Sequence, residues 1–138
     1  IYRLPTESEW EYVTKAGSNT RFPNGDHIKN LNIANCIDCL FLESPGPLPV
    51  GSFPPNAWGL YDTLGNVDEW VEDCMNLEGY KGHPNDGSAY ISEDCNDRVA
   101  RGGSWEYPSE TLRSTWRDWY PPEDKTWEQG FRIVRELP

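Results

Sequence analysis

The stretch FPPNAWGLYDTLGNVDEWVED, residues 53–73, joins a run of turn-forming residues to a segment with the composition of a strand. Pro, Asn and Gly dominate its first half, and residues 67–71 have the β-branched and aromatic content that strands favour. Gly65 lies between the two halves and allows a sharp backbone bend. The stretch therefore predicts a turn that leads directly into a strand.

The same stretch offers oxygen ligands for a hard cation. Asp62 and Glu69 provide carboxylates, and Gly65 and Val67 provide backbone carbonyls, which are the groups that calcium binds. Residues 65, 67 and 69 share one face if the segment is extended. These four residues are a candidate metal site. The alternative is a turn whose acidic residues are simply solvated.

The composition bounds the class of protein. The chain has 138 residues, which is the size of one domain, and its 12 Lys and Arg against 23 Asp and Glu give a net charge of −11. This charge argues against binding to nucleic acid and favours cations. No apolar run is long enough for a membrane span. Because the chain begins at Ile1 inside an apparently structured segment, we expect a fragment or a processed product.

The stretch LPTESEWEYVTKAG, residues 4–17, predicts a helix. Thr6 and Glu9 have the spacing of a capping box, and Gly17 is a stop signal. Trp10 and Val13 are expected to form the buried stripe of this helix.

The rest of the chain predicts loops and short strands. Residues 18–49 lack periodicity and predict a long irregular region that needs disulfides or metal ions to hold it. The strands are predicted at 50–53, 67–71, 99–101, 111–116 and 131–134. We therefore expect a loop-rich α+β fold with a small antiparallel sheet and a core built on large aromatic residues.

Four cysteines occur, at positions 36, 39, 74 and 95. An even number in an acidic, loop-rich domain indicates disulfides and an oxidising compartment, which favours an extracytoplasmic or secreted protein. Several pairings are open, among which a long link between Cys74 and Cys95 is favoured. Cys36 and Cys39 could also be a redox pair or half of a zinc site, and free thiols are a further alternative.

Three segments carry a family resemblance. RLPTESEWEYVTKAG at 3–17, FPPNAWGLYDTLGNVDEWVED at 53–73, and RVARGGSW, LRSTWRDW and GFRIVR within 98–135 resemble the formylglycine-generating enzyme, or sulfatase-modifying factor, family. They match the C-terminal part of the family domain, so we expect residues 1–138 to be one partial domain that lacks the N-terminal part. The resemblance implies a variant of the C-type lectin fold, reinforced by calcium.

The family's calcium site maps onto Asp62 and Glu69 through side chains and onto Gly65 and Val67 through carbonyls. Asp68 departs from the family pattern, which usually has tryptophan there. It adds negative charge beside the site or else faces water.

A second calcium site of the family would use Asn35, the carbonyl of Cys36 and an acidic residue downstream. The loop differs in length here, and Glu43 is the nearest acidic residue. The sequence does not assign this second site.

The resemblance also implies where catalytic groups would lie. In the oxidases of the family, two cysteines after the double glycine bind copper, and here those positions hold Tyr107 and Leu112. Sulfoxide synthases of the family take iron from histidines, whereas His27 and His83 lie in loop-like surroundings. The sequence therefore predicts no catalytic residue and no copper.

Aromatic and arginine side chains near the C-terminus are candidates for a ligand-binding rim, since such side chains supply stacking faces and planar donors. Some of them could instead belong to the core or to structural ion pairs. The candidates are Trp105, Tyr107, Glu110, Arg113, Trp116, Arg117, Trp119 and Trp127.

Three functions are consistent with these features. The first is a calcium-stabilised, non-catalytic module that binds a protein, peptide or small ligand or has a structural role. The second is an oxidoreductase of the formylglycine-generating or sulfoxide-synthase type, completed by N-terminal regions. The third is a retroelement-diversified ligand-binding protein. The sequence assigns neither the ligand nor the oligomeric state.

Overall fold

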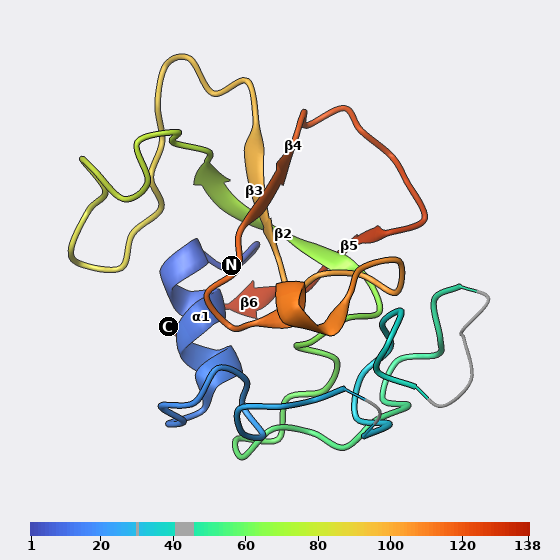
Figure 1. The fold of residues 1–138 in the computed structure, drawn as a ribbon. Helices are drawn as coiled ribbons and strands as arrows, with labels where there is room; N and C mark the ends of the chain where they lie inside the picture. The colour runs from blue at the N-terminus through green and yellow to red at the C-terminus, as the bar shows by residue number, and fades with distance from the viewer. Residues whose placement is uncertain (30, 41–45) are drawn as a thin grey trace.

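The computed structural model describes residues 1–29, 31–40 and 46–138, which form one α-helix, one short 3-10 helix and six short strands connected by long loops (Figure 1). In these ranges no helix has both the length and the apolar composition needed to cross a membrane. The loop-rich α+β class predicted from the sequence is confirmed.

Helix α1, Glu7–Lys15, begins with the predicted capping box. The Thr6 hydroxyl accepts a hydrogen bond from the Glu9 amide at 3.1 Å, and the Glu9 carboxylate accepts one from the Thr6 amide at 2.8 Å. The helix ends at Ala16, which adopts a left-handed conformation one residue before the predicted stop. Trp10 is fully buried, whereas Val13 is only half-buried.

The main sheet has four strands in the order β4-β3-β2-β5. They are β2 (Asp68–Cys74), β3 (Arg98–Arg101), β4 (Asp118–Tyr120) and β5 (Gln129–Phe131). The sheet is mixed and not purely antiparallel as predicted, because β2 runs parallel to β5 and antiparallel to β3. A separate antiparallel pair joins β1 (Tyr2–Arg3) to β6 (Val134–Arg135) and brings the chain ends together.

The predicted strands at 67–71 and 99–101 are confirmed by β2 and β3, and the one at 131–134 is split between β5 and β6. The predicted strands at 50–53 and 111–116 are wrong. Residues 50–53 lie in a turn and bends, and Ser109–Leu112 form the 3-10 helix η1. β-Branched and aromatic residues favour strands because they pack well on a half-buried sheet surface. Here Leu112 is instead buried from the 3-10 helix.

Two hydrophobic clusters hold the fold. One lies between α1 and the sheet and contains Trp10, Val71 and Val99. The other gives the irregular region its own core, and Figure 1 shows that region gathered below the sheet. Its buried members are Phe22, Ile28, Ala34, Cys36, Cys39, Leu64 and Leu112.

Two disulfides confirm the prediction of an oxidised framework. Cys74–Cys95 links the end of β2 to the loop before β3, as favoured from the sequence, and Cys36–Cys39 closes a tight turn in the irregular region. None of the four cysteines is a free thiol.

Candidate functional site

The double glycine after β3 forms a tight turn over Leu112. Gly102 and Gly103 both have positive φ, at 101° and 71°. A Cβ atom on Gly103 would lie 2.7 Å from Leu112 Cδ1, so only glycine fits there. Leu112, at one position of the family's cysteine pair, is a fully buried core residue.

Tyr107, at the other position, ends a chain of hydrogen bonds that leads into the sheet. Its hydroxyl lies 2.9 Å from the hydroxyl of Tyr120 on β4, which donates to Asp68 Oδ2 at 2.9 Å. The other oxygen, Asp68 Oδ1, accepts a hydrogen bond from the Gly103 amide at 2.9 Å. The structure therefore connects a half-buried phenol to a fully buried carboxylate on β2. Asp68 was flagged in the sequence as unusual, but no sequence signal identified Tyr120.

The electrostatic environment of these hydrogen-bonded side chains favours the neutral form of the Asp68 carboxyl group. Burial, together with the negative charge of Asp118, raises the pKa of Asp68 to about 7, against the opposing effect of the Tyr120 and Gly103 hydrogen bonds. Burial also raises the pKa of Tyr120 and of Tyr107. Near neutral pH this group can therefore exchange a proton, but it offers no sulfur ligand to a soft metal.

Replacement of Asp68 by Asn is expected to stabilise the protein more at pH 8.5 than at pH 5. The folded pKa lies above the unfolded value of about 3.9, so the Asp68 contribution is complete below about pH 4 and is lost as the pH rises through 7. Asn carries no charge; its amide oxygen can accept from the Gly103 amide and its NH2 group can donate to the Tyr120 hydroxyl, so we expect a gain of roughly 1–3 kcal/mol at pH 8.5. Chemical denaturation at both pH values measures it. Asp124→Asn, at an exposed turn, is the control, and an equal effect of Asp68→Asn at both pH values would contradict the prediction.

The first predicted calcium site contains a protein cation. Both oxygens of the Glu69 carboxylate accept from Arg132, each at 2.5 Å, and Oε2 also accepts from the Trp10 indole at 2.6 Å. Arg132 donates in addition to the carbonyl of Asp62 at 3.3 Å, whereas the Asp62 carboxylate accepts from the Gly51 amide at 2.6 Å. Calcium at Glu69 would therefore have to share the carboxylate with Arg132 or displace it. The four-residue site stays a prediction.

The second calcium site has one feature that fits a metal. Asn35 is fully buried, and its Oδ1 accepts no hydrogen bond from the described residues, while its Nδ2 donates to Gly46 and Asn66. A buried amide oxygen without a donor is a ligand that calcium takes. Glu43, the nearest acidic residue, lies outside the described residues.

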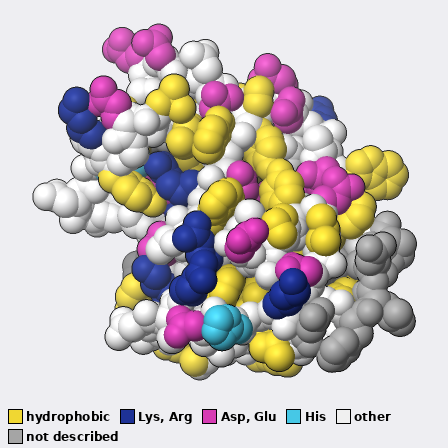
Figure 2. All heavy atoms as spheres, viewed as in Figure 1, with side chains coloured by type: hydrophobic (Ala, Val, Ile, Leu, Met, Phe, Trp, Pro, Cys, Tyr) yellow, Lys and Arg dark blue, Asp and Glu magenta, His cyan; other side chains and the backbone are white. Residues whose placement is uncertain are grey.

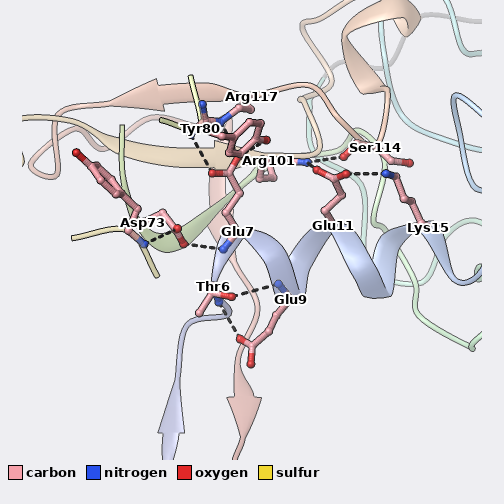
Figure 3. Close-up of polar contacts among 11 residues, drawn as sticks. Thr6, Glu7, Glu9, Glu11, Lys15, Asp73, Tyr80, Arg101, Ser114 and Arg117 are labelled. Carbon is pink, nitrogen blue, oxygen red and sulfur yellow. Dashed lines mark hydrogen bonds and ion pairs between the residues drawn. The ribbon is translucent and has the colours of Figure 1, made fainter. Parts of the chain in front are cut away.

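Arg117 has a partner other than a ligand. Its Nε and Nη2 donate to the Glu7 carboxylate at 2.6 and 2.9 Å, and it lies 4.5 Å from the ring centre of Tyr80. Arg101 also donates to Glu7 at 2.5 Å, and Figure 3 shows the three side chains converging on Glu7 at the start of α1. Glu7 and Arg101 are 3% and 0% exposed, so this is a buried ion-pair network.

The remaining rim candidates are not brought to one place by a shared contact. Arg113 lies over the ring of Trp116 at 5.3 Å, and the Trp116 indole donates to Asp118 at 2.9 Å. The exposed members are Glu110, Trp119, at 44%, and Trp127, at 84%. Trp105 has a buried indole nitrogen without a partner among the described residues, and Glu110 lies in η1.

A large apolar cavity lies elsewhere, and sequence reasoning missed it. It has a volume of about 610 Å³, which is within the range of ligand pockets, and its walls come from β2, β3, β5 and the loop before β3. Alternating outward residues of β2 and an exposed aromatic on β5 were the available signal. The lining includes Trp70, Val71, Ile91, Arg98, Pro122 and Phe131.

The chain matches the family model described as "Sulfatase-modifying factor enzyme 1-like domain" over residues 1–137, and it belongs to this family. It is 37% identical to the formylglycine-generating enzyme of Mus musculus over 97% of this chain and 39% of that protein. It is 35% identical to the serine/threonine-protein kinase pkn1 of Chlamydia caviae, over 96% of this chain and 21% of that protein. A third relative is the hercynine oxygenase of Mycolicibacterium smegmatis, at 33% identity over 98% of this chain and 33% of that protein. The chain thus spans less than half the length of each.

Solved structures agree with this membership. The structure of PvdO from Pseudomonas aeruginosa is similar with a TM-score of 0.87 and 41% identity, over 99% of this chain and 53% of that chain. Treponema denticola variable protein 1 is similar with a TM-score of 0.78 and 29% identity, over 96% of this chain and 46% of that chain. The resemblance stated from the sequence is confirmed, and the fold is that of the formylglycine-generating enzyme family.

Proposed function

We propose that this chain is a calcium-stabilised module of the family that binds a ligand and does not oxidise cysteine with copper. The proposal rests on the identity and the contacts of the residues at positions 107 and 112. Copper(I) requires soft ligands such as thiolates. Leu112 is a core residue, the phenol of Tyr107 is hydrogen-bonded to the hydroxyl of Tyr120, and all four cysteines are in disulfides.

The test is incubation of the chain with copper(I) and a cysteine-containing sulfatase peptide. We expect mass spectrometry to show an unchanged peptide. The formylglycine-generating enzyme of Mus musculus, under the same conditions, is the positive control. Conversion of the cysteine to an aldehyde by this chain would refute the non-catalytic part of the proposal.

The 610 Å³ cavity is the proposed ligand site, because apolar walls with a few polar groups are typical of ligand pockets. Titration with an anilinonaphthalene sulfonate dye probes it by fluorescence. Ile91→Ser removes an apolar wall and is expected to weaken binding several-fold. Leu77→Ser changes another exposed apolar residue, which lies outside the cavity, and is expected to have no effect. Equal effects of the two variants would place the dye elsewhere.

Calcium is expected to raise the melting temperature, since an ion that binds only the folded state stabilises it by roughly 3 kcal/mol at a hundredfold excess over Kd. The buried oxygen of Asn35, which has no hydrogen-bond donor among the described residues, supports this expectation, whereas Glu69 would bind calcium only by sharing its carboxylate with Arg132 or displacing it. Calorimetry with calcium, and with magnesium at the same concentration, separates binding from charge screening. No shift, or an equal shift with magnesium, would contradict calcium binding.

An oxidoreductase is the second candidate, and the identity to the formylglycine-generating enzyme and the hercynine oxygenase favours it. Its activity would need regions that this chain does not span. A retroelement-diversified binder is supported by the likeness to Treponema denticola variable protein 1. Sequence variation between isolates, concentrated at Tyr107, Glu110, Trp119 and Trp127, would favour that third function.

A further inference from the structure

A polar cavity of about 310 Å³ lies between the C-terminal end of α1 and the segment that follows η1. Lys15, Arg21 and Arg113 line it together with uncharged polar side chains that include Asn19 and Thr115, and no acidic residue is part of the lining. The chain has 23 Asp and Glu but only 12 Lys and Arg, so three cations around one cavity without an acid is an unusual local arrangement. Figure 2 shows Lys and Arg side chains gathered over α1 and the segment after η1.

The carboxylates next to the cavity are shared among several cations. Lys15 pairs with Glu11 at 2.6 Å, but Glu11 also accepts from Arg101 at 2.7 Å. Glu7 accepts from both Arg101 and Arg117, and the Asp73 carboxylate accepts from the Glu7 amide at 2.6 Å. Lys15 therefore shares its only ion-pair partner among the described residues with Arg101. The carbonyl end of α1 opposes an anion with only about half a charge, which the full charge of Lys15 offsets.

Two of the cations, Arg21 and Arg113, have side-chain N–H groups without a hydrogen-bond partner among the described residues. The guanidinium of Arg21 makes no hydrogen bond or ion pair with the described residues, although the Asp26 carboxylate accepts from its backbone amide at 3.1 Å. Among the described residues Arg113 uses only Nε, which donates to the carbonyl of Glu110 at 3.1 Å, and its guanidinium carbon lies 5.3 Å from the centre of the Trp116 ring. Neither terminal nitrogen of Arg113 has a hydrogen-bond partner in the part of the chain that the structure describes.

The walls of the cavity are tied to each other. The amide of Ser114 donates to the carbonyl of Arg21 at 3.1 Å, which joins the loop after α1 to the 113–115 segment. Phe22 and Gly25 exchange two backbone hydrogen bonds that close this loop. The backbone positions of Arg21 and Arg113 are thus fixed relative to each other before any ligand binds, which leaves mainly side-chain entropy to be lost on binding.

We propose that this cavity binds a phosphate or sulfate group, with Arg21 and Arg113 as the main donors and Lys15 as a supporting charge. Planar guanidinium forks match the oxygens of such anions, and charge-assisted hydrogen bonds are the strong ones. The site is separate from positions 107 and 112 and does not depend on the proposed function.

Nuclear magnetic resonance titration of the 138-residue chain with inorganic phosphate, sulfate and chloride at constant ionic strength tests the site. Phosphate and sulfate are expected to shift the amides of residues 18–21 and 113–115 with saturation. Chloride, which offers no oxygens, is expected to shift them little. Equal responses to all three salts, or shifts spread over the whole surface, would overturn the proposal.

Variants distinguish a specific anion site from nonspecific electrostatic attraction to the surface. Arg113→Gln and Arg21→Gln are each expected to weaken phosphate binding roughly tenfold, because a hydrogen bond to a charged group contributes at least that much. Arg135→Gln removes the same charge from an exposed position on β6 and is expected to leave the affinity unchanged. Arg21 is exposed and its side chain has no described partner, so its replacement is not expected to affect folding. An Arg135→Gln effect as large as that of Arg21→Gln would refute the site.

Discussion

Replacement of Glu7 by Gln is expected to lower the free energy of unfolding by about 3–5 kcal/mol, because it removes the buried carboxylate that pairs with both Arg101 and Arg117. Glu7 is 3% exposed and Arg101 is fully buried. Arg117 loses the same partner. The remaining carboxylate, Glu11, contacts only one terminal nitrogen of Arg101. Urea denaturation at neutral pH measures the loss.

Glu78→Gln is the matched control for this change. It also removes one carboxylate from an ion pair, with Lys81 at 2.6 Å, but both side chains are more than half exposed. An exposed pair contributes about 0–1 kcal/mol, so the control is expected to be nearly neutral. Comparable losses for Glu7→Gln and Glu78→Gln would show that the buried network does not stabilise the fold.

Gly65→Ala is expected to destabilise the protein by about 3 kcal/mol, the sum of a left-handed backbone and an overpacked contact. Gly65 has φ of 67°, and an added Cβ would lie 2.3 Å from the carbonyl oxygen of Asn35. That oxygen belongs to the backbone and accepts a hydrogen bond from the Asn66 amide at 2.8 Å. The Gly65 amide donates a hydrogen bond to the carbonyl of Gly102 at 2.8 Å. The strand and the irregular region would have to separate. Thermal and urea denaturation both report it.

Gly79→Ala distinguishes the two causes. Gly79 has φ of 74°, close to that of Gly65, but an added Cβ would meet nothing within 4 Å. It therefore carries only the conformational penalty, which is about 1–2 kcal/mol. If Gly65→Ala were no worse than Gly79→Ala, the close approach between Gly65 and Asn35 would not be a feature of the protein in solution.

Local sequence signals predicted the helix and two strands of the main sheet. The capping box of α1 joins Thr6 to Glu9, three residues apart, and it forms as expected. β2 and β3 were found because their apolar residues pack in the sheet and their flanking residues favour turns. The residues at 111–116 have a similar composition but follow Pro108 into η1, where the burial of Leu112 decides the conformation.

The candidate sites divide in the same way. A link between Cys74 and Cys95 could be favoured from the sequence, which left the pairing open. The predicted placement of Tyr107 and Leu112 at the positions of the family's cysteine pair could be read from motif order. The chain from Tyr107 through Tyr120 to Asp68 could not, since its members are 13 and 52 residues apart. Nor could Arg113 be assigned to a cavity that depends on a loop 92 positions earlier, at Arg21.

The sequence by itself determined the family and the helix with its cap, because each depends on residue identity or on spacing within one segment. Only the tertiary structure decided which charges became partners. Glu7 meets Arg101 and Arg117 across 94 and 110 residues, and Arg132 reaches Glu69 across 63. A charged side chain has no preferred partner in the sequence. Its partner is set by which segments the core brings together, and by the free energy that a buried charge loses when it has none.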